Sequence, residues 1–210
     1  MIVAIPLFHR VTALDAVGPY EVLSRLPGAT VRFVADEPGA KRTENGMLAL
    51  TADAALDDVP EPDVVVVPGG LGTRALLDDE RMLAWLRRAH ATSRCTTSVC
   101  TGSLLLAAAG ILDGAPATTH WLVLDKLGEL GATPVRDRVV EHGKVITAAG
   151  VSAGIDMALL LAARLAGDEI AQAIQLGIEY DPQPPFRAGS AATAPPAVVE
   201  LVRDRAATFA

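Results

Sequence analysis

The chain has 210 residues, of which 50% are hydrophobic and 4% aromatic, and its formal net charge is −7 at pH 7. That length can bury one sizeable core, and a mean hydropathy of +0.34 predicts a compact, aliphatic, single-domain globule. The acidic balance, with no basic cluster, argues against nucleic acid or an anionic membrane surface as the main partner.

The N-terminal residues and the two cysteines indicate the cellular compartment of the protein. Met1 is followed at once by a short apolar run, without the charged start or cleavage site of a signal peptide. No apolar run approaches the length that spans a bilayer. Cys95 and Cys100 lie too close together for a disulfide framework and lack metal-ligand spacing. We therefore expect a cytoplasmic protein.

The first half of the chain alternates between predicted strands and helices. Residues 2–7 and 29–35 read as strands around a helix over residues 15–23, and Asn45-Gly46 signals a hairpin. The clearest strand is the run Val64-Val65-Val66-Val67. It is followed by Pro68-Gly69-Gly70, which predicts a buried parallel strand that ends in a tight loop.

The second half continues this alternation. Helices are predicted over residues 79–91, 103–109, 118–130, 155–166, 168–180 and 197–208, with strands at 95–99 and two short strands within 138–147. Residues 181–196 are rich in Pro, Ala and Gly. The pattern predicts an α/β fold with a doubly wound, mostly parallel sheet sandwiched by helices, flavodoxin-like, in a single domain over residues 1–210.

The stretch around Cys100 changes from a β-branched strand to an alanine- and leucine-rich helix, with Cys100-Thr101-Gly102 at the turn. A nucleophile at such a strand-to-helix turn is a nucleophile elbow. The helix N-terminus is expected to lower the pKa of the Cys100 thiol. The alternative is that Cys100 is one more small buried residue.

Two other loops are expected beside Cys100, because ligands bind beyond the carboxyl ends of parallel strands. One leads to Asp15, which is either a site residue or a helix N-cap. The other contains Gly69 and Gly70, whose N–H groups, with that of Thr101, are candidate donors to a developing negative charge. A plain tight turn is the alternative there.

Either His120 or Asp15 is the candidate acid/base partner of Cys100. His120 is also a candidate substrate-binding residue, with a capping or packing role as its alternative, whereas Asp15 would share one proton with the thiol. The four histidines lack ligand spacing, and neither a dinucleotide fingerprint nor a phosphate loop is present, so we expect no metal and no cofactor.

Three segments carry a family resemblance: Pro68-Gly69-Gly70, Ser98-Val99-Cys100-Thr101-Gly102, and residues 149–156. They resemble the ThiJ/PfpI group of the class I glutamine amidotransferase-like superfamily. Residues 15–23, 117–121 and 175–186 are similar to its isonitrile hydratase subgroup. Cys-Thr-Gly replaces the Cys-His-Gly of protease- and amidotransferase-like members, which argues against peptidase or amidase activity.

The resemblance implies a cofactor-independent lyase that adds water to an isonitrile and gives an N-substituted formamide. Cys100 would form a thioimidate, Asp15 would act as acid and base, and Thr101 would bind substrate or water. A homodimer is implied as well. Three alternatives are a cysteine-based redox sensor or chaperone-like protein, hydrolase or glyoxalase chemistry, and the ligand-sensing domain of AraC-type regulators. The last is not expected of an acidic chain that stops at Ala210.

Overall fold

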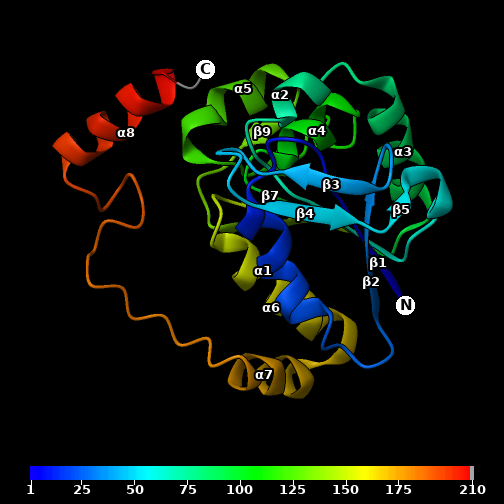
Figure 1. Ribbon diagram of the computed structural model, residues 1–210. Coiled ribbons are helices and arrows are strands. Elements are labelled where there is room, and N and C mark those ends of the chain that lie inside the picture. Colours follow the sequence, from blue (N-terminus) through cyan, green and yellow to red (C-terminus); the bar gives the residue numbers. More distant parts are fainter. Residues whose placement is uncertain (209–210) are drawn as a thin grey trace. The chain divides into compact units, whose positions relative to one another are not determined.

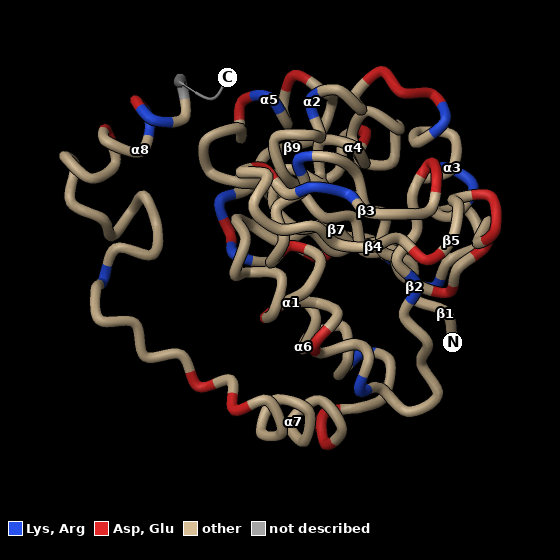
Figure 2. Tube along the Cα trace, in the orientation of Figure 1, with Lys and Arg blue, Asp and Glu red and all other residues tan. Residues whose placement is uncertain are grey.

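The computed structural model describes residues 1–208. Met1–Ile178 form one compact unit, and the residues from Glu179 onward form a second. Figure 2 shows Lys and Arg interspersed with Asp and Glu along the first unit.

The first unit is built on a central sheet (Figure 1). Its seven strands within residues 1–208 are β1 (Ile2–Pro6), β2 (Thr30–Ala35), β5 (Ala54–Ala55), β6 (Val64–Val67), β7 (Cys95–Val99), β10 (Val139–His142) and β11 (Val145–Ala148). Their order is β10-β11-β7-β6-β1-β2-β5. Only β10 runs antiparallel to its neighbour. Without the two-residue edge strand β5 and the antiparallel β10, the parallel strands follow the order β2-β1-β6-β7-β11, which is the doubly wound, flavodoxin-like order and confirms the predicted fold class.

The middle strands have the composition of a sheet that is covered on both faces. All four valines of β6 are 0% exposed. A continuous apolar run of this kind is typical of a parallel strand with helices above and below it. The register between β6 and β7 pairs Val67 with Ser98, so both strands end at the same edge of the sheet.

Helices cover both faces of the sheet. On one face an apolar cluster joins the sheet to α1 (Ala13–Leu23), α6 (Ala153–Ala166) and α7 (Asp168–Gly177). On the other face a second cluster joins it to α3 (Glu80–Thr92), α4 (Gly102–Ala108) and α5 (Leu124–Glu129). α1 and α6 pack side by side (Figure 1). A short helix, α2 (Thr73–Leu76), and two 3-10 turns, Leu56–Asp58 and Trp121–Val123, complete the unit.

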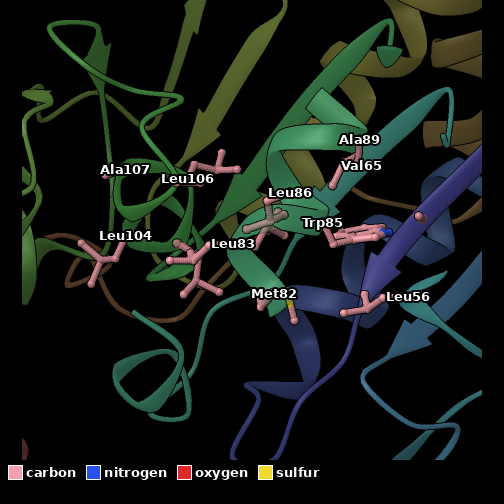
Figure 3. Close-up of a cluster of buried hydrophobic side chains, with 14 of the residues drawn as sticks. Leu56, Val65, Met82, Leu83, Trp85, Leu86, Ala89, Leu104, Leu106 and Ala107 are labelled. Atoms are coloured by element: carbon pink, nitrogen blue, oxygen red, sulfur yellow. The ribbon is translucent and has the colours of Figure 1, made fainter. Parts of the chain in front are cut away.

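Trp85 of α3 is the largest side chain in the second cluster. Figure 3 shows it among Leu56, Val65 and Leu86. It is 0% exposed, and its indole Nε1–H donates to the carbonyl oxygen of Val59 over 3.0 Å. The one polar group that this ring buries therefore has a partner.

Two small sheets lie outside the central one. β3 (Gly39–Arg42) and β4 (Ala49–Ala52) form the antiparallel hairpin predicted from Asn45-Gly46. β8 (Pro116–Ala117) and β9 (Thr133–Pro134) pair in parallel. With two residues each, β5, β8 and β9 are too short to show a period in the sequence.

Two predicted helices differ from the structure. The predicted helix 118–130 begins only at Trp121, because the Thr118 N–H donates to Thr147 Oγ1 and the Thr119 hydroxyl donates to the Cys100 carbonyl. The predicted helix 168–180 ends at Gly177, and Glu179 has a φ of 49°, which a helix cannot accommodate.

The second unit is described by itself. Residues 179–195 form no helix or strand, and α8 (Pro196–Thr208) lies where the last helix is predicted. Residues 209–210 of the predicted single domain lie outside the described residues, and the assignment of one domain to the whole chain stays a prediction. No helix in the described part of the chain is both long and apolar enough to cross a membrane.

Gly102, the first residue of α4, brings the elbow into contact with the end of β6. A Cβ atom at this position would lie 2.1 Å from the Val67 carbonyl oxygen and 2.9 Å from that of Pro68. Both are backbone atoms, which cannot turn away as a side chain can. The close approach of the elbow to the neighbouring strand therefore requires glycine here.

We predict that Gly102→Ala destabilises the fold by about 1–3 kcal/mol, as overpacking against backbone does. Gly177→Ala is the matched control, because Gly177 is also helical and a Cβ there meets nothing within 4 Å. The control should be neutral, or more stable by up to about 1 kcal/mol. Urea unfolding of both variants measures the difference, and equal stability of the two would contradict the assigned role of Gly102.

Candidate active site

The candidate site lies where β1, β6 and β7 end at one edge of the sheet. The loop after β1 leads to Asp15 in the first turn of α1, the loop after β6 contains Gly69 and Gly70, and Cys100 follows β7 directly. This is also the point where the strand order reverses, between β1 and β6. Ligands of doubly wound sheets bind at such a point.

Cys100 has the strained backbone of a nucleophile elbow, with a φ of 56°. Hydrogen bonds hold it in that conformation. Its N–H donates to the carbonyl oxygens of Ala148 and Ala149, over 3.1 and 2.9 Å. Its own carbonyl accepts from the hydroxyls of Ser103 and Thr119, over 3.1 and 2.9 Å. Backbone strain that several hydrogen bonds maintain in this way is typical of functional sites.

Asp15 is completely buried, at 0% exposed. The helix N-cap is Thr12, not Asp15, so the N-cap interpretation of Asp15 is wrong. Its Oδ2 accepts from the Gly69 N–H over 2.9 Å. Among residues 1–208, Oδ1 has no partner with good hydrogen-bond geometry, although the Cys100 thiol is close enough to favour the ionised carboxylate. One carboxyl oxygen is therefore fixed by Gly69, and the carboxyl group as a whole lies beside the thiol.

Burial sets the acidity of this carboxyl group. Loss of hydration raises the pKa of Asp15 to about 7, aided by the charge of Glu44 and opposed by the hydrogen bonds from Gly69 and Cys100. A carboxyl group with a pKa near neutrality is suited to taking up and releasing a proton.

The expected lowering of the Cys100 pKa is wrong. Burial, and next the charge of Asp15, raise the pKa of the thiol well above its usual range. Hydrogen bonds from the N–H groups of Val151 and Thr101 oppose this effect and are outweighed. A helix N-terminus stabilises a thiolate, but not against burial combined with a neighbouring carboxylate.

Val151, in the loop before α6, shares the strain of the elbow. Its φ is 34°, which is rare for a β-branched residue, and its N–H points to the Cys100 sulfur. The next residue, Ser152, is the N-cap of α6, and Arg138 forms an ion pair with Asp156 in the first turn of that helix. The Arg138 guanidinium also donates to Ser152 Oγ over 3.4 Å, so one side chain joins this loop to the first turn of α6.

Gly69 and Gly70 are brought to the site, but their N–H groups are already used. The Gly69 N–H donates to Asp15, and the Gly70 N–H donates to Thr101 Oγ1 over 2.8 Å. A Cβ atom at Gly69 would lie 2.5 Å from the Thr101 nitrogen and 2.9 Å from Asp15 Oδ2. The pair therefore orients Asp15 and Thr101, and its direct contact with substrate stays a prediction.

Thr101 is half-buried and engages Gly70 twice. Its hydroxyl accepts from the Gly70 N–H and donates to the Gly70 carbonyl over 3.1 Å. A substrate or water that binds this hydroxyl would have to share it with Gly70. The contact of Thr101 with substrate stays a prediction.

His120 lies at the edge of the site as a helix cap. Its Nδ1 accepts from the Leu122 N–H over 3.4 Å, and burial lowers the pKa of its imidazole. Its ring is also close to Gly150, where a Cβ atom would lie 2.7 Å from His120 Cδ2. This geometry agrees with a capping and packing role, Asp15 lies beside Cys100, and a contact between His120 and substrate stays a prediction.

Glu44 belongs to the site and was missed in the sequence, where it lies in the polar turn of a hairpin. Its Oε1 accepts from the Thr12 hydroxyl and from the Leu71 N–H, the latter over 3.2 Å. Its charge raises the pKa of Asp15, Cys100 and His120. No sequence signal connects residue 44 with these loops.

Metal ligands do not gather here. Within the described residues, no three His, Cys, Asp or Glu side chains lie close enough together to hold a metal ion. Both cysteines are free and buried.

Comparison with known proteins identifies relatives of this chain in sequence and in structure. The family model described as the DJ-1/PfpI family matches residues 1–164. The isonitrile hydratase of Pseudomonas putida is 49% identical over 201 residues, which cover 96% of this chain and 88% of that protein. A crystal structure of a ThiJ/PfpI family protein from Pseudomonas syringae is 38% identical, with a TM-score of 0.95, and the match covers 99% of this chain and 86% of the other.

Regulators are also among the relatives. The HTH-type transcriptional regulator CdhR of Pseudomonas aeruginosa is 30% identical over 171 residues, which cover 80% of this chain and 50% of the regulator. The family model and the near-full-length relatives agree with the elbow, the sheet order and the predicted resemblance. The chain belongs to the DJ-1/PfpI family.

Proposed function

We propose that this protein is an isonitrile hydratase, a hydro-lyase that converts R–N≡C and water into the formamide R–NH–CHO. The observation that carries the proposal is the buried Cys100–Asp15 pair, in which Asp15 lies close enough to the thiol to interact with it and Asp15 Oδ1 has no hydrogen-bond partner among residues 1–208. The 49% identity to the Pseudomonas putida isonitrile hydratase supports the same reaction.

The pair supplies one nucleophile and one mobile proton. Above a pH near 7 it holds a single proton, because the carboxyl group has lost its own while the thiol keeps its proton. Asp15 takes the thiol proton as the Cys100 sulfur attacks the terminal carbon of the isonitrile. Asp15 then delivers that proton to the same carbon, and the product is the thioimidate R–N=CH–S–Cys100.

Water completes the reaction. It adds to the thioimidate carbon while Asp15 takes one of its protons and passes it to the nitrogen. The C–S bond then breaks, the carbonyl of the formamide forms, and the hydroxyl proton returns to the sulfur. The sum is one isonitrile and one water consumed, with the pair restored. These steps involve no change of oxidation state of the protein and no cofactor.

The surrounding residues support these steps in different ways. Gly69 orients the carboxyl group, and the N–H groups of Thr101 and Val151 face the sulfur where charge develops. Thr101 would share its hydroxyl with substrate or water. A cytoplasmic location and a homodimer belong to the same proposal, on the resemblance alone.

A redox-sensing function is disfavoured by the same geometry. Oxidation of a cysteine begins from the thiolate, and burial beside Asp15 raises the pKa of Cys100. The N–H donors around the sulfur only partly oppose that effect.

The direct test is formamide production from a simple alkyl isonitrile. Cys100→Ala should abolish turnover, and Asp15→Asn should lower kcat/KM by 10²-fold or more, since it removes the proton carrier but keeps an acceptor for Gly69. Cys95→Ala is the control, because Cys95 begins β7, at the strand end opposite Cys100. Full activity of Cys100→Ala would exclude the thioimidate.

The pH dependence follows from the shared proton. Because the pair carries two protons below a pH near 7, kcat/KM should rise through that region and level off above it. A stopped assay of formamide between pH 5 and 9 measures the profile. A fall in kcat/KM across the same range would contradict a mechanism that uses the singly protonated pair.

The free energy of unfolding should fall as the pH rises, in the opposite sense to kcat/KM. The pKa of Asp15 is raised in the folded chain from 3.8 to about 7, so its contribution to stability is fully present below pH 4 and is lost as the pH rises through 7. The loss corresponds to about 4 kcal/mol at most. Asp15→Asn should therefore be more stable than wild type at pH 8, by an amount that shrinks towards pH 4. Urea unfolding at several pH values measures the difference, and a constant difference would contradict the raised pKa.

A further inference from the structure

Glu44 adds an exposed carboxylate beside the Cys100–Asp15 pair. We propose that Glu44 is a selectivity-determining residue that favours uncharged and cationic isonitriles over isonitriles that carry a carboxylate. The substrate class rests on the proposed function, whereas the charge preference itself can be measured without it.

The hairpin between β3 and β4 reaches the two loops that build the site. The Glu44 N–H donates to the Val11 carbonyl over 3.2 Å, and Val11 also forms a parallel bridge with Thr43. The Glu44 carboxylate accepts from the Thr12 hydroxyl and from the Leu71 N–H. Hydrogen bonds therefore anchor both the backbone and the carboxylate of Glu44 to the loops that follow β1 and β6.

Those anchors lie next to the reacting groups along the chain. Thr12 is the N-cap of α1, three residues before Asp15. Leu71 directly follows Gly70, whose N–H binds Thr101. A carboxylate held between Thr12 and Leu71 cannot turn away from the site, unlike an unanchored surface glutamate.

The two acidic residues of the site, Asp15 and Glu44, differ in their exposure to solvent. Asp15 is 0% exposed, whereas Glu44 is exposed. Burial raises the pKa of Asp15 to about 7, whereas Glu44 is an acidic side chain exposed to solvent. Its effect extends to Asp15, Cys100 and His120, the three titratable groups of the site.

No cation neutralises this charge. Within residues 1–208, none of the ion pairs includes Glu44. Arg42, two positions earlier, directs its guanidinium to the Gly46 carbonyl over 3.1 Å. A substrate carboxylate would therefore enter against a Glu44 charge that no ion pair among residues 1–208 offsets.

The first test compares two isonitriles of similar size, isocyanoacetamide and the isocyanoacetate anion. Wild type should favour the amide in kcat/KM, and Glu44→Gln should narrow that preference about three- to tenfold, as removal of one nearby charge does. Glutamine keeps an oxygen that can accept from Thr12 and Leu71. Glu61→Gln, which removes an equal charge from an exposed position, should leave the preference unchanged.

Salt provides a measurement that needs no variant. Because an exposed charge is screened, the wild-type preference should weaken as ionic strength rises from about 0.01 to 0.5 M, and Glu44→Gln should respond less. If wild type turns over both substrates and Glu44→Gln keeps the same ratio, the inference is wrong and the proposed function stands.

A second arm is independent of isonitrile turnover. Iodoacetamide and iodoacetate alkylate the same sulfur and differ by one negative charge, and peptide mass spectrometry follows Cys100 separately from Cys95. The ratio of the two rates should be larger in wild type than in Glu44→Gln by a similar factor. A narrowed ratio without hydration of any isonitrile would retain the charge preference and overturn the proposed function. Equal ratios in the two proteins would overturn the inference.

Discussion

The site depends on one physical constraint, the burial of a carboxyl group against a thiol. Two such groups cannot both be ionised in a region without water, so the pair keeps at least one proton. The structure enforces this with 0% exposure of Asp15 and with a single N–H donor on its Oδ2. The remaining features of the site determine where that proton can move.

The backbone holds this pair together through close approaches that only particular residues allow. Cys100 and Val151 both have positive φ angles, and their carbonyl and N–H groups are used in the elbow and in the loop before α6. Gly69 and Gly102 let the end of β6 contact the elbow without a side chain between them. Local strain and missing side chains thus provide the space in which thiol and carboxyl meet.

The sequence predicts the fold well because the fold follows from local patterns. The valine run of β6, the strand-to-helix change at Cys100 and the Asn45-Gly46 turn each have a short-range signal, and the central sheet contains them as expected. Errors arise where tertiary hydrogen bonds override propensity, as at Thr118 and Thr119. The resemblance and the edge of the parallel sheet are sufficient to locate Cys100, Asp15 and the two glycines together.

The acidity of these groups could not be predicted in the same way. A helix N-terminus is visible in sequence and suggests a lowered thiol pKa, but burial depends on how distant segments pack, and burial dominates here. Glu44 was missed for the same reason, since it reaches the site from a hairpin through Thr12 and Leu71. Motifs locate the candidate nucleophile, Cys100, whereas packing determines whether its thiol is ionised.

The direction in which the thiol pKa is shifted distinguishes two ways in which a cysteine can react. A thiolate that is stable at rest reacts with oxidants and electrophiles alike, and its reactivity is present before any substrate binds. A thiol that gives up its proton only to a neighbouring carboxyl group becomes nucleophilic when a substrate can receive that proton in turn. An isonitrile carbon accepts both the sulfur and the proton, so a buried Cys100–Asp15 pair is matched to an α-addition more closely than to peroxide sensing or amide hydrolysis.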